Sequence, residues 1–256
     1  MPHARLHSYQ QMPILSPKEL TGRARTHVME LAEPRCTLHP AALEAFVALR
    51  AAAARDAGID LAAASSFRDF EQQRAIWNGK YTGQRSLLDH AGMPLQAARM
   101  EPERIVRAIL HWSALPGASR HHWGTDLDVI DRAALSAGQR AQLLPSEYAP
   151  TGVFSRLARW LAEHAEDYGF FLPYDRYRGG VQPEPWHLSY APVSNLALSE
   201  LTVELLAAVL EEAELEGADI VLRDLPQIHA RYVAAVAPAN DRALAAVRLS
   251  PAARPS

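Results

Sequence analysis

Two short clusters of polar side chains constrain what this chain can fold into. The first is Ser119-Arg120-His121-His122-Trp123-Gly124-Thr125-Asp126-Leu127-Asp128, and the second, about sixty residues later, is Glu184-Pro185-Trp186-His187. Together they offer two histidines and a carboxylate as metal ligands, with one further carboxylate to take a proton from water. Three protein ligands and one open position are typical of a catalytic zinc site. A fold that uses this set must bring the two clusters together.

The local sequence allows the ligands to converge. His121 and Asp128 are seven residues apart, so a straight strand would place them on opposite faces. Gly124 lies between them and lets the chain turn. Pro185 follows Glu184 directly and disfavours a helix there. We therefore expect Glu184 and His187 on a turn that enters a strand.

Composition narrows the class of protein. The chain has 256 residues, of which 48% are hydrophobic and 21% charged, as in an ordinary globular protein with one domain or one domain and an extension. The net charge of -3 gives no broad basic field, which argues against a nucleic-acid partner. The single cysteine, Cys36, excludes an intrachain disulfide and fits a reducing compartment.

Targeting signals are not apparent in the sequence. The N-terminal residues contain no apolar core followed by a small-residue cleavage site, and no stretch approaches the ~20 apolar residues of a membrane span. We therefore predict a cytoplasmic protein that does not bind a membrane. The sequence makes no prediction of the oligomeric state.

Hydrophobic periodicity and Gly/Pro punctuation predict where the helices and strands of the chain lie. Helices are expected at 40–57, 69–77, 102–112 and 153–168, and short strands at 59–64, 125–130 and 184–190. Residues 1–38 are expected to be irregular and residues 78–100 to form a loop. After residue 192 we expect a helix at 199–215 with Ser199 as its N-cap, a second helix at 225–237, and a disordered tail.

The two clusters resemble the motifs of VanY-type D-alanyl-D-alanine carboxypeptidases, Ser-x-His-x-x-Gly-x-x-x-Asp and Glu-x-Trp-His. These enzymes belong to a zinc peptidase group that includes lysostaphin-like enzymes and the Hedgehog domain. A third match is Ser65-Ser66-Phe67-Arg68 followed by Gln73, so the resemblance covers roughly residues 40–191. It implies an α+β fold, in which a small antiparallel sheet carries the metal and is flanked by helices. It places that domain at 39–191, between an irregular segment at 1–38 and a helical extension at 192–256.

The resemblance also implies a metal site. It assigns one zinc ion per chain, held by His121, Asp128 and His187. It assigns Glu184 as the general base, and then as the acid that protonates the leaving amine. Arg68 is expected to bind the substrate carboxylate or the developing oxyanion, because a planar cation suits both tasks.

Further residues are implied to bind substrate. Ser119 is expected to hydrogen-bond to the terminal carboxylate, and Gln73 and Ser65 to be supporting contacts. The chain departs from the family at two positions, with Ser66 in place of glycine and Asp126 in place of a small residue. Asp126 can either orient a ligand histidine or compete with Asp128 for the metal.

The expected activity is removal of the C-terminal D-alanine from a peptidoglycan stem peptide. A cytoplasmic location favours L,D-cleavage of tetrapeptides during wall recycling, because D,D-cleavage there would destroy the pentapeptide precursors. Three alternatives stay open at this point: a D,D-carboxypeptidase, a wall-lytic endopeptidase and a non-catalytic zinc-binding module. The expected partner is a muropeptide.

Overall fold

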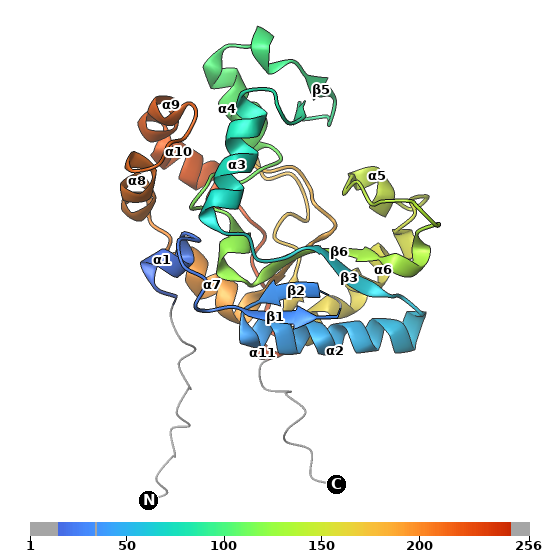
Figure 1. Cartoon of the computed structure of the whole chain (residues 1–256). Helices are drawn as coiled ribbons and strands as arrows, with labels where there is room; N and C mark the ends of the chain where they lie inside the picture. Colours follow the sequence, from blue (N-terminus) through green and yellow to red (C-terminus); the bar gives the residue numbers. More distant parts are fainter. Residues whose placement is uncertain (1–14, 34, 247–256) are drawn as a thin grey trace, which may run out of the picture.

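The computed structural model describes residues 15–33 and 35–246 (Figure 1). Its centre is a four-stranded antiparallel sheet with the strand order β3-β6-β8-β7. These strands are Leu61–Ser65, Asp126–Asp131, His187–Tyr190 and Phe170–Phe171, respectively. The predicted α+β class with a small antiparallel sheet is therefore confirmed.

The register of the sheet brings the two polar clusters side by side. Asp128 on β6 is the pairing partner of His187 on β8, and Asp126 pairs with Ser189. On the other side of β6, Ser65 of β3 pairs with Asp128, after an irregularity between Ala63 and Ser65. The segment that follows β3 and the segment that precedes β8 therefore both lie next to Asp128 of β6.

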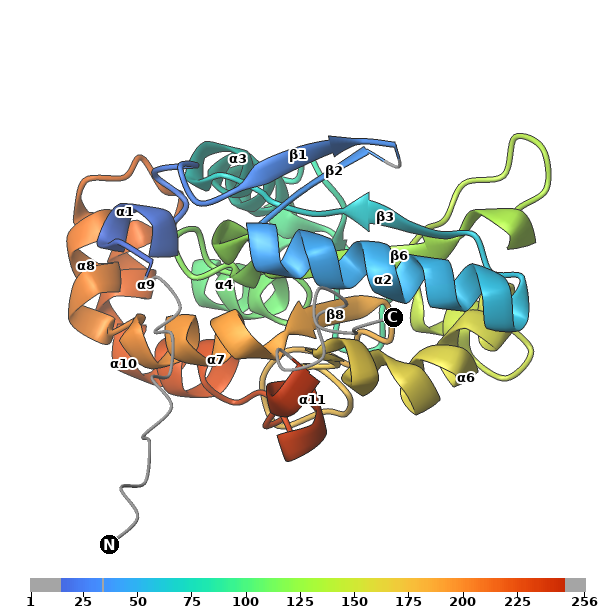
Figure 2. The ribbon, with the colours of Figure 1, turned by 90° about the horizontal axis from the view of Figure 1, so that it is seen from below.

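One hydrophobic cluster lies between the sheet and two helices. The helices are α2 (Pro40–Ala57) and α6 (Ser155–His164), which lie along the same side of the molecule in Figure 2. The cluster contains Phe46 of α2, Leu161 of α6 and the strand residues Leu127 and Leu188. Because all four are buried, this packing fixes the position of β6 and β8.

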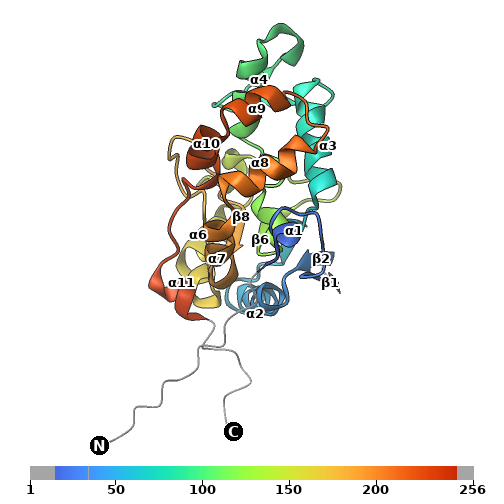
Figure 3. The same ribbon diagram turned by 90° about the vertical axis from the view of Figure 1, so that its left-hand side faces the viewer.

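A second hydrophobic cluster fills the other half of the molecule, and most of the helices that form it lie in the upper part of Figure 3. It is formed by α3 (Phe70–Tyr81), α4 (Pro102–Leu110), α7 (Ala191–Glu200), α8 (Val203–Glu211), α9 (Ala218–Arg223) and α10 (Leu225–Ile228). Trp77 of α3 is fully buried there, and its indole nitrogen donates to the carbonyl of Glu216 at 3.0 Å. The segment after residue 192 thus shares a core with α3 and α4.

The N-terminal region differs from the prediction. Residues expected to be irregular contain α1 (Pro17–Leu20) and a hairpin of β1 (Met29–Ala32) and β2 (Arg35–Leu38). Residues 1–14 lie outside the described part of the chain. Cys36 and Leu38, two residues apart on β2, are both buried, as in a strand with one face toward the core. The four prolines of the region obscured this period-2 pattern in the sequence.

The predicted loop at 78–100 is also more ordered than expected. Helix α3 continues to Tyr81, and a small hairpin of β4 (Leu87–Leu88) and β5 (Pro94–Leu95) follows. The remaining short elements are η1 (Ala97–Arg99), η2 (Arg120–Trp123), η3 (Arg132–Ala134), α5 (Pro145–Tyr148) and η4 (Ala165–Tyr168).

The predicted helix at 199–215 is wrong in its start and its length. The chain is helical up to Glu200, breaks at Leu201 and restarts in α8, where the Thr202 hydroxyl accepts from the backbone N–H of Leu205. Ser199 caps nothing, because its hydroxyl donates to the Leu196 carbonyl. Thr202 is the better N-cap, since its extended backbone allows this contact.

The C-terminal prediction holds only in part. The helix expected at 225–237 consists of α10 and the π-helical turn η5 (His229–Val233), and α11 (Asp241–Ala245) lies beyond Pro238. The tail expected to be disordered, residues 247–256, is outside the described residues. No single helix of residues 15–33 and 35–246 has the length and apolarity to cross a membrane, and α7 and α8 meet those criteria only as a pair bent by 74°.

Candidate metal centre and active site

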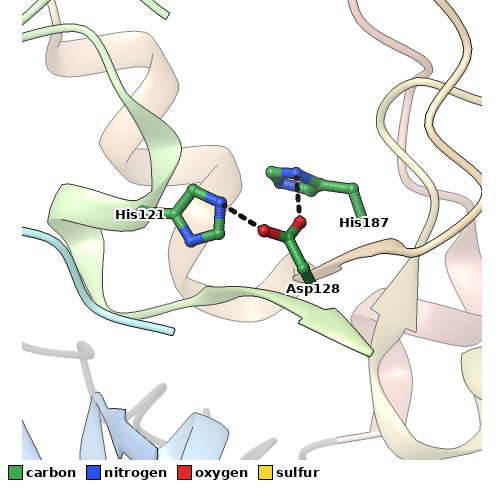
Figure 4. A group of neighbouring side chains, drawn as sticks. All are labelled: His121, Asp128 and His187. Carbon is green, nitrogen blue, oxygen red and sulfur yellow. Dashed lines mark ion pairs between the residues drawn. The ribbon is translucent and has the colours of Figure 1, made fainter. Parts of the chain in front are cut away.

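The three predicted ligands converge at one point (Figure 4). Nε2 of His121 lies 3.5 Å from Oδ2 of Asp128, and Nδ1 of His187 lies 3.3 Å from Oδ1 of the same carboxylate. All three residues are buried, and their candidate ligand atoms lie within 4.8 Å of one another. The structure therefore brings together two imidazoles and one carboxylate from segments that are far apart in the sequence.

A left-handed glycine makes this convergence possible. His121 lies on the 3-10 turn η2, which ends at Gly124 with φ of 66°. A Cβ atom on Gly124 would lie 2.4 Å from Cγ1 of Val28 and 2.8 Å from the backbone nitrogen of His39. The expected turn is thus present, and both its conformation and its close packing require glycine.

Hydrogen bonds determine which nitrogen of each histidine faces the centre. Nδ1 of His121 lies 2.9 Å from the carbonyl oxygen of Ser66, which can only accept, so Nδ1 donates and Nε2 is free. Nε2 of His187 lies 3.0 Å from Oδ1 of Asp126, so Nδ1 is free on this ring. Two different nitrogens therefore point at Asp128, each held by a partner on the far side of its ring.

Asp126 lies behind His187 rather than among the ligands. Its side chain is 0% exposed and accepts from Arg120 Nε at 2.8 Å and from the Thr125 hydroxyl at 2.5 Å. Burial raises the pKa of this carboxyl, but the Arg120 cation and the hydrogen bonds outweigh it and hold the pKa well below its usual range. Of the two roles open to Asp126, the structure favours orienting a ligand histidine.

The donor set fits a zinc ion. Ligand atoms bound tetrahedrally at about 2.0–2.1 Å lie roughly 3.4 Å apart, close to the two separations found here. Oδ1 of Asp128 is buried and accepts no hydrogen bond, although it faces His187. Burial lowers the pKa of His187, but its three carboxylate neighbours raise it well above the usual value. The pocket therefore favours a positive charge between these atoms.

Glu184 completes the constellation. Its Oε2 lies 3.2 Å from Nδ1 of His187, on a turn where the Glu184 backbone N–H donates to the Tyr174 carbonyl. Burial raises the pKa of Glu184 despite its contact with His187. A carboxylate whose pKa is raised toward neutrality can both take and return a proton.

Comparison with known proteins identifies the family. A family model of D-alanyl-D-alanine carboxypeptidases, VanY, matches residues 35–193. The chain belongs to the VanY family. An uncharacterized protein of Haemophilus influenzae is 38% identical over 121 residues, which cover 46% of this chain and 92% of that protein.

Three further similar proteins are one carboxypeptidase sequence and two solved structures. A D-alanyl-D-alanine carboxypeptidase of Enterococcus faecalis is 27% identical over 144 residues, 55% of this chain and 44% of that protein. A structure of VanYB in complex with D-Ala-D-Ala has 20% identity and a TM-score of 0.48, over 80% of this chain and 92% of that one. A structure of the LdcB LD-carboxypeptidase has 21% identity and a TM-score of 0.43, over 72% of this chain and 67% of that one.

Arg68, which the VanY resemblance implicates in catalysis, lies beside the metal ligands. Its guanidinium donates to Oε1 of Gln73 at 2.6 Å and to Oγ of Ser65 at 3.0 Å, and its backbone N–H donates to the carbonyl of His121. Within residues 15–33 and 35–246, no acidic side chain lies within ion-pair distance of Arg68. The positive charge is therefore available for a substrate.

Gln73 and Ser65 act through Arg68. Neither lines the cleft, so both hold Arg68 in place rather than contact the substrate as predicted for them. The side-chain amide nitrogen of Gln73, Nε2, donates to the carbonyl of Ala114 at 2.7 Å. Ser119, in contrast, does line the cleft, and its buried side chain makes no hydrogen bond to any described residue. Its placement agrees with the predicted contact to a terminal carboxylate.

His122 is a packed residue that supports the site and does not belong to the group of candidate ligands. It is fully buried, and Nδ1 lies 2.6 Å from the Arg68 carbonyl while Nε2 accepts from the Gly117 N–H at 3.1 Å. Burial lowers the pKa of His122 to about 3, so the ring is neutral and Nδ1 is the donor. His122 therefore fixes the backbone of Arg68.

These groups open into one cleft of about 650 Å³. The catalytic candidates His121, Asp128, Glu184 and His187 form part of its wall. Other parts of the wall come from the β4–β5 hairpin (residues 88 and 90–92) and from residues 142–146 and 181–183. The cleft is larger than a single amino acid requires.

Proposed function

We propose that this chain is a zinc-dependent carboxypeptidase that removes a terminal D-alanine from peptidoglycan stem peptides. The observation that carries the proposal is the convergence of His121, Asp128 and His187, with the Glu184 carboxylate 3.2 Å from His187 Nδ1. Membership of the VanY family supports the substrate class. The two imidazole nitrogens and one carboxylate oxygen are the donors that catalytic zinc prefers.

The side chains divide the reaction between them. When bound, a zinc ion would polarise the scissile carbonyl and lower the pKa of a water molecule. Glu184 takes the proton of the attacking water and returns it to the departing amine. Arg68 stabilises the negative charge that develops on the substrate or binds its carboxylate, and Ser119 donates a hydrogen bond to the terminal carboxylate.

A comparison of Glu184 variants tests the proposal. The wild type should release D-alanine from a purified muropeptide, and EDTA should stop the release until zinc is added back. Glu184→Gln should bind one zinc as the wild type does but lose roughly 10²–10⁴-fold in turnover, the usual contribution of general acid–base catalysis. Glu163→Gln, at an exposed glutamate on α6, is the matched control. Full activity of Glu184→Gln would reject this assignment.

The finer proposal concerns the bond that is cut. We propose L,D-cleavage of a tetrapeptide in cytoplasmic wall recycling, because D,D-cleavage in the compartment that holds pentapeptide precursors would consume them. Tetrapeptide and pentapeptide should be incubated separately, with mass detection of the products. Loss of alanine from the tetrapeptide is the expected result, and cleavage of the pentapeptide alone would replace the L,D assignment with D,D.

A further inference from the structure

A second cation shares the cleft with Arg68. Lys80 lies near the end of α3, and its ammonium donates a hydrogen bond to the hydroxyl of Ser113 at 2.6 Å. Both of these side chains line the cleft. Only two of the 26 basic residues of the chain are lysines, Lys18 and Lys80, so the lysine in the cleft is easily followed in an experiment.

Lys80 has no carboxylate of its own. No acidic side chain of residues 15–33 and 35–246 lies within ion-pair distance of its ammonium. The carboxylates that line the cleft, Asp128 and Glu184, both face His187 instead, at 3.3 Å and 3.2 Å. Burial lowers the pKa of Lys80 to about 8, with Glu184 opposing this effect and Arg68 and Arg85 adding to it. The ammonium is therefore still mostly protonated at neutral pH.

The two cations of the cleft are anchored separately. Arg68 is held by Gln73 and Ser65, whereas Lys80 is held by Ser113. Each anchor is neutral, so neither one offsets the charge that it holds. A half-buried cation without a counter-ion, close enough to Arg68 to be repelled by it, destabilises the fold. Such an arrangement is typical of a site that receives an anion from a ligand.

We propose that Lys80 and Ser113 form a second carboxylate subsite, which takes an acidic group of the substrate other than the one bound by Arg68. An ammonium and a neighbouring hydroxyl are both donors, and a charge-assisted hydrogen bond to a carboxylate is stronger than a neutral one. The preferred substrates are therefore peptides that carry a free carboxylate on a side chain near the scissile bond. This inference rests on the proposed peptidase function and specifies its substrate class.

Paired peptides test the subsite. The two peptides have the same sequence and differ only in whether the acidic side chain ends in a carboxylate or a carboxamide. The zinc-loaded wild type should prefer the carboxylate peptide roughly 10–100-fold in kcat/KM, as expected for a hydrogen bond to a charged group. Lys80→Met should abolish the preference through KM, with little change in kcat. Ser113→Ala should weaken it, and Lys18→Met should not alter it.

A second measurement separates this inference from the proposed function. Reductive ¹³C-methylation labels Lys18 and Lys80, and NMR follows both in zinc-loaded Glu184→Gln protein with each peptide added. The carboxylate peptide should raise the pKa of Lys80 alone, even if no peptide is hydrolysed by the wild type. In that case the subsite stands and the peptidase assignment fails. Hydrolysis that Lys80→Met reduces equally for both peptides, with no response of the Lys80 signal, would overturn the subsite.

Discussion

Nε2 of His187 lies 3.0 Å from Oδ1 of Asp126, and this contact leaves Nδ1 of the same ring facing Asp128. Nε of Arg120 donates to the same oxygen of Asp126 at 2.8 Å, and Nη2 of Arg120 donates to the hydroxyl of Ser189 at 2.6 Å. The result is a buried chain from arginine to carboxylate to imidazole to the metal position. Such a carboxylate fixes the ring orientation and makes the free nitrogen a better ligand.

Neutralising Asp126 should therefore weaken metal binding. We expect Asp126→Asn to raise the Kd for zinc about 10–100-fold, measured by competition with a chromophoric chelator, because an amide polarises the imidazole less than a carboxylate. Asp131→Asn is a suitable control, since Asp131 is a buried carboxylate on the same strand whose partners lie outside the site. It should lower stability and leave zinc affinity unchanged. Wild-type affinity in Asp126→Asn would show that the carboxylate does not tune His187.

Arg68 should not tolerate replacement by lysine. Its guanidinium reaches Gln73 and Ser65 at once, a geometry that a single ammonium cannot reproduce. We expect Arg68→Lys to retain zinc and lose roughly 10²-fold in kcat/KM, the order found when one transition-state donor is removed. Arg74→Lys is the control, because Arg74 pairs with Glu71 and donates to the carbonyl of Glu214 but does not line the cleft. An Arg68→Lys enzyme with wild-type kinetics would contradict the role given to the planar cation.

Gly124 and Gly58 form a matched pair for testing the turn. Both have positive φ, 66° and 60°, but a Cβ on Gly58 would meet no atom within 4 Å, whereas one on Gly124 would overlap Val28. Gly58→Ala should lower the free energy of unfolding by about 1–2 kcal/mol, the cost of the left-handed backbone for an L-residue. Gly124→Ala should cost more and lower zinc affinity, because His121 must move. Urea unfolding and a zinc titration measure both. Equal losses in the two variants would argue against the close contact.

Lys80 makes stability depend on pH in the alkaline range. Its pKa is about 8 in the folded protein and 10.5 for a free lysine, so the unfolded chain holds more protons between these values and stability rises with pH. The destabilisation is complete below pH 8 and disappears above pH 10.5. Lys80→Met should thus be more stable than the wild type at pH 7, and the difference should shrink as pH rises. Urea unfolding from pH 7 to 10.5 measures it, and a constant difference would contradict a buried charge.

The sequence by itself determined the chemistry of the site. His121, Asp128, Glu184 and His187 were predicted from residue type and from the resemblance to the short VanY motifs, and the structure brings these four side chains together. Gly124 was identified for the same kind of reason, since a turn between two converging ligands requires a residue free of Cβ. Helix α2 and strands β3 and β6 were predicted from the local pattern of apolar residues, because a segment that buries one face repeats its apolar residues at the period of its secondary structure.

Only the tertiary structure decided how those residues are held. Asp126 could be a ligand or a supporting carboxylate until the β6–β8 register placed it behind His187. His122 and Arg68 meet through a contact between residues 54 positions apart, which local propensity cannot encode. Ser65 and Gln73 were assigned to substrate, and folding turned them toward Arg68. The hydrogen-bond partners of buried groups depend on how distant segments pack together. The candidate reacting groups could therefore be predicted from the sequence, whereas the partners that hold them could be found only from the tertiary structure.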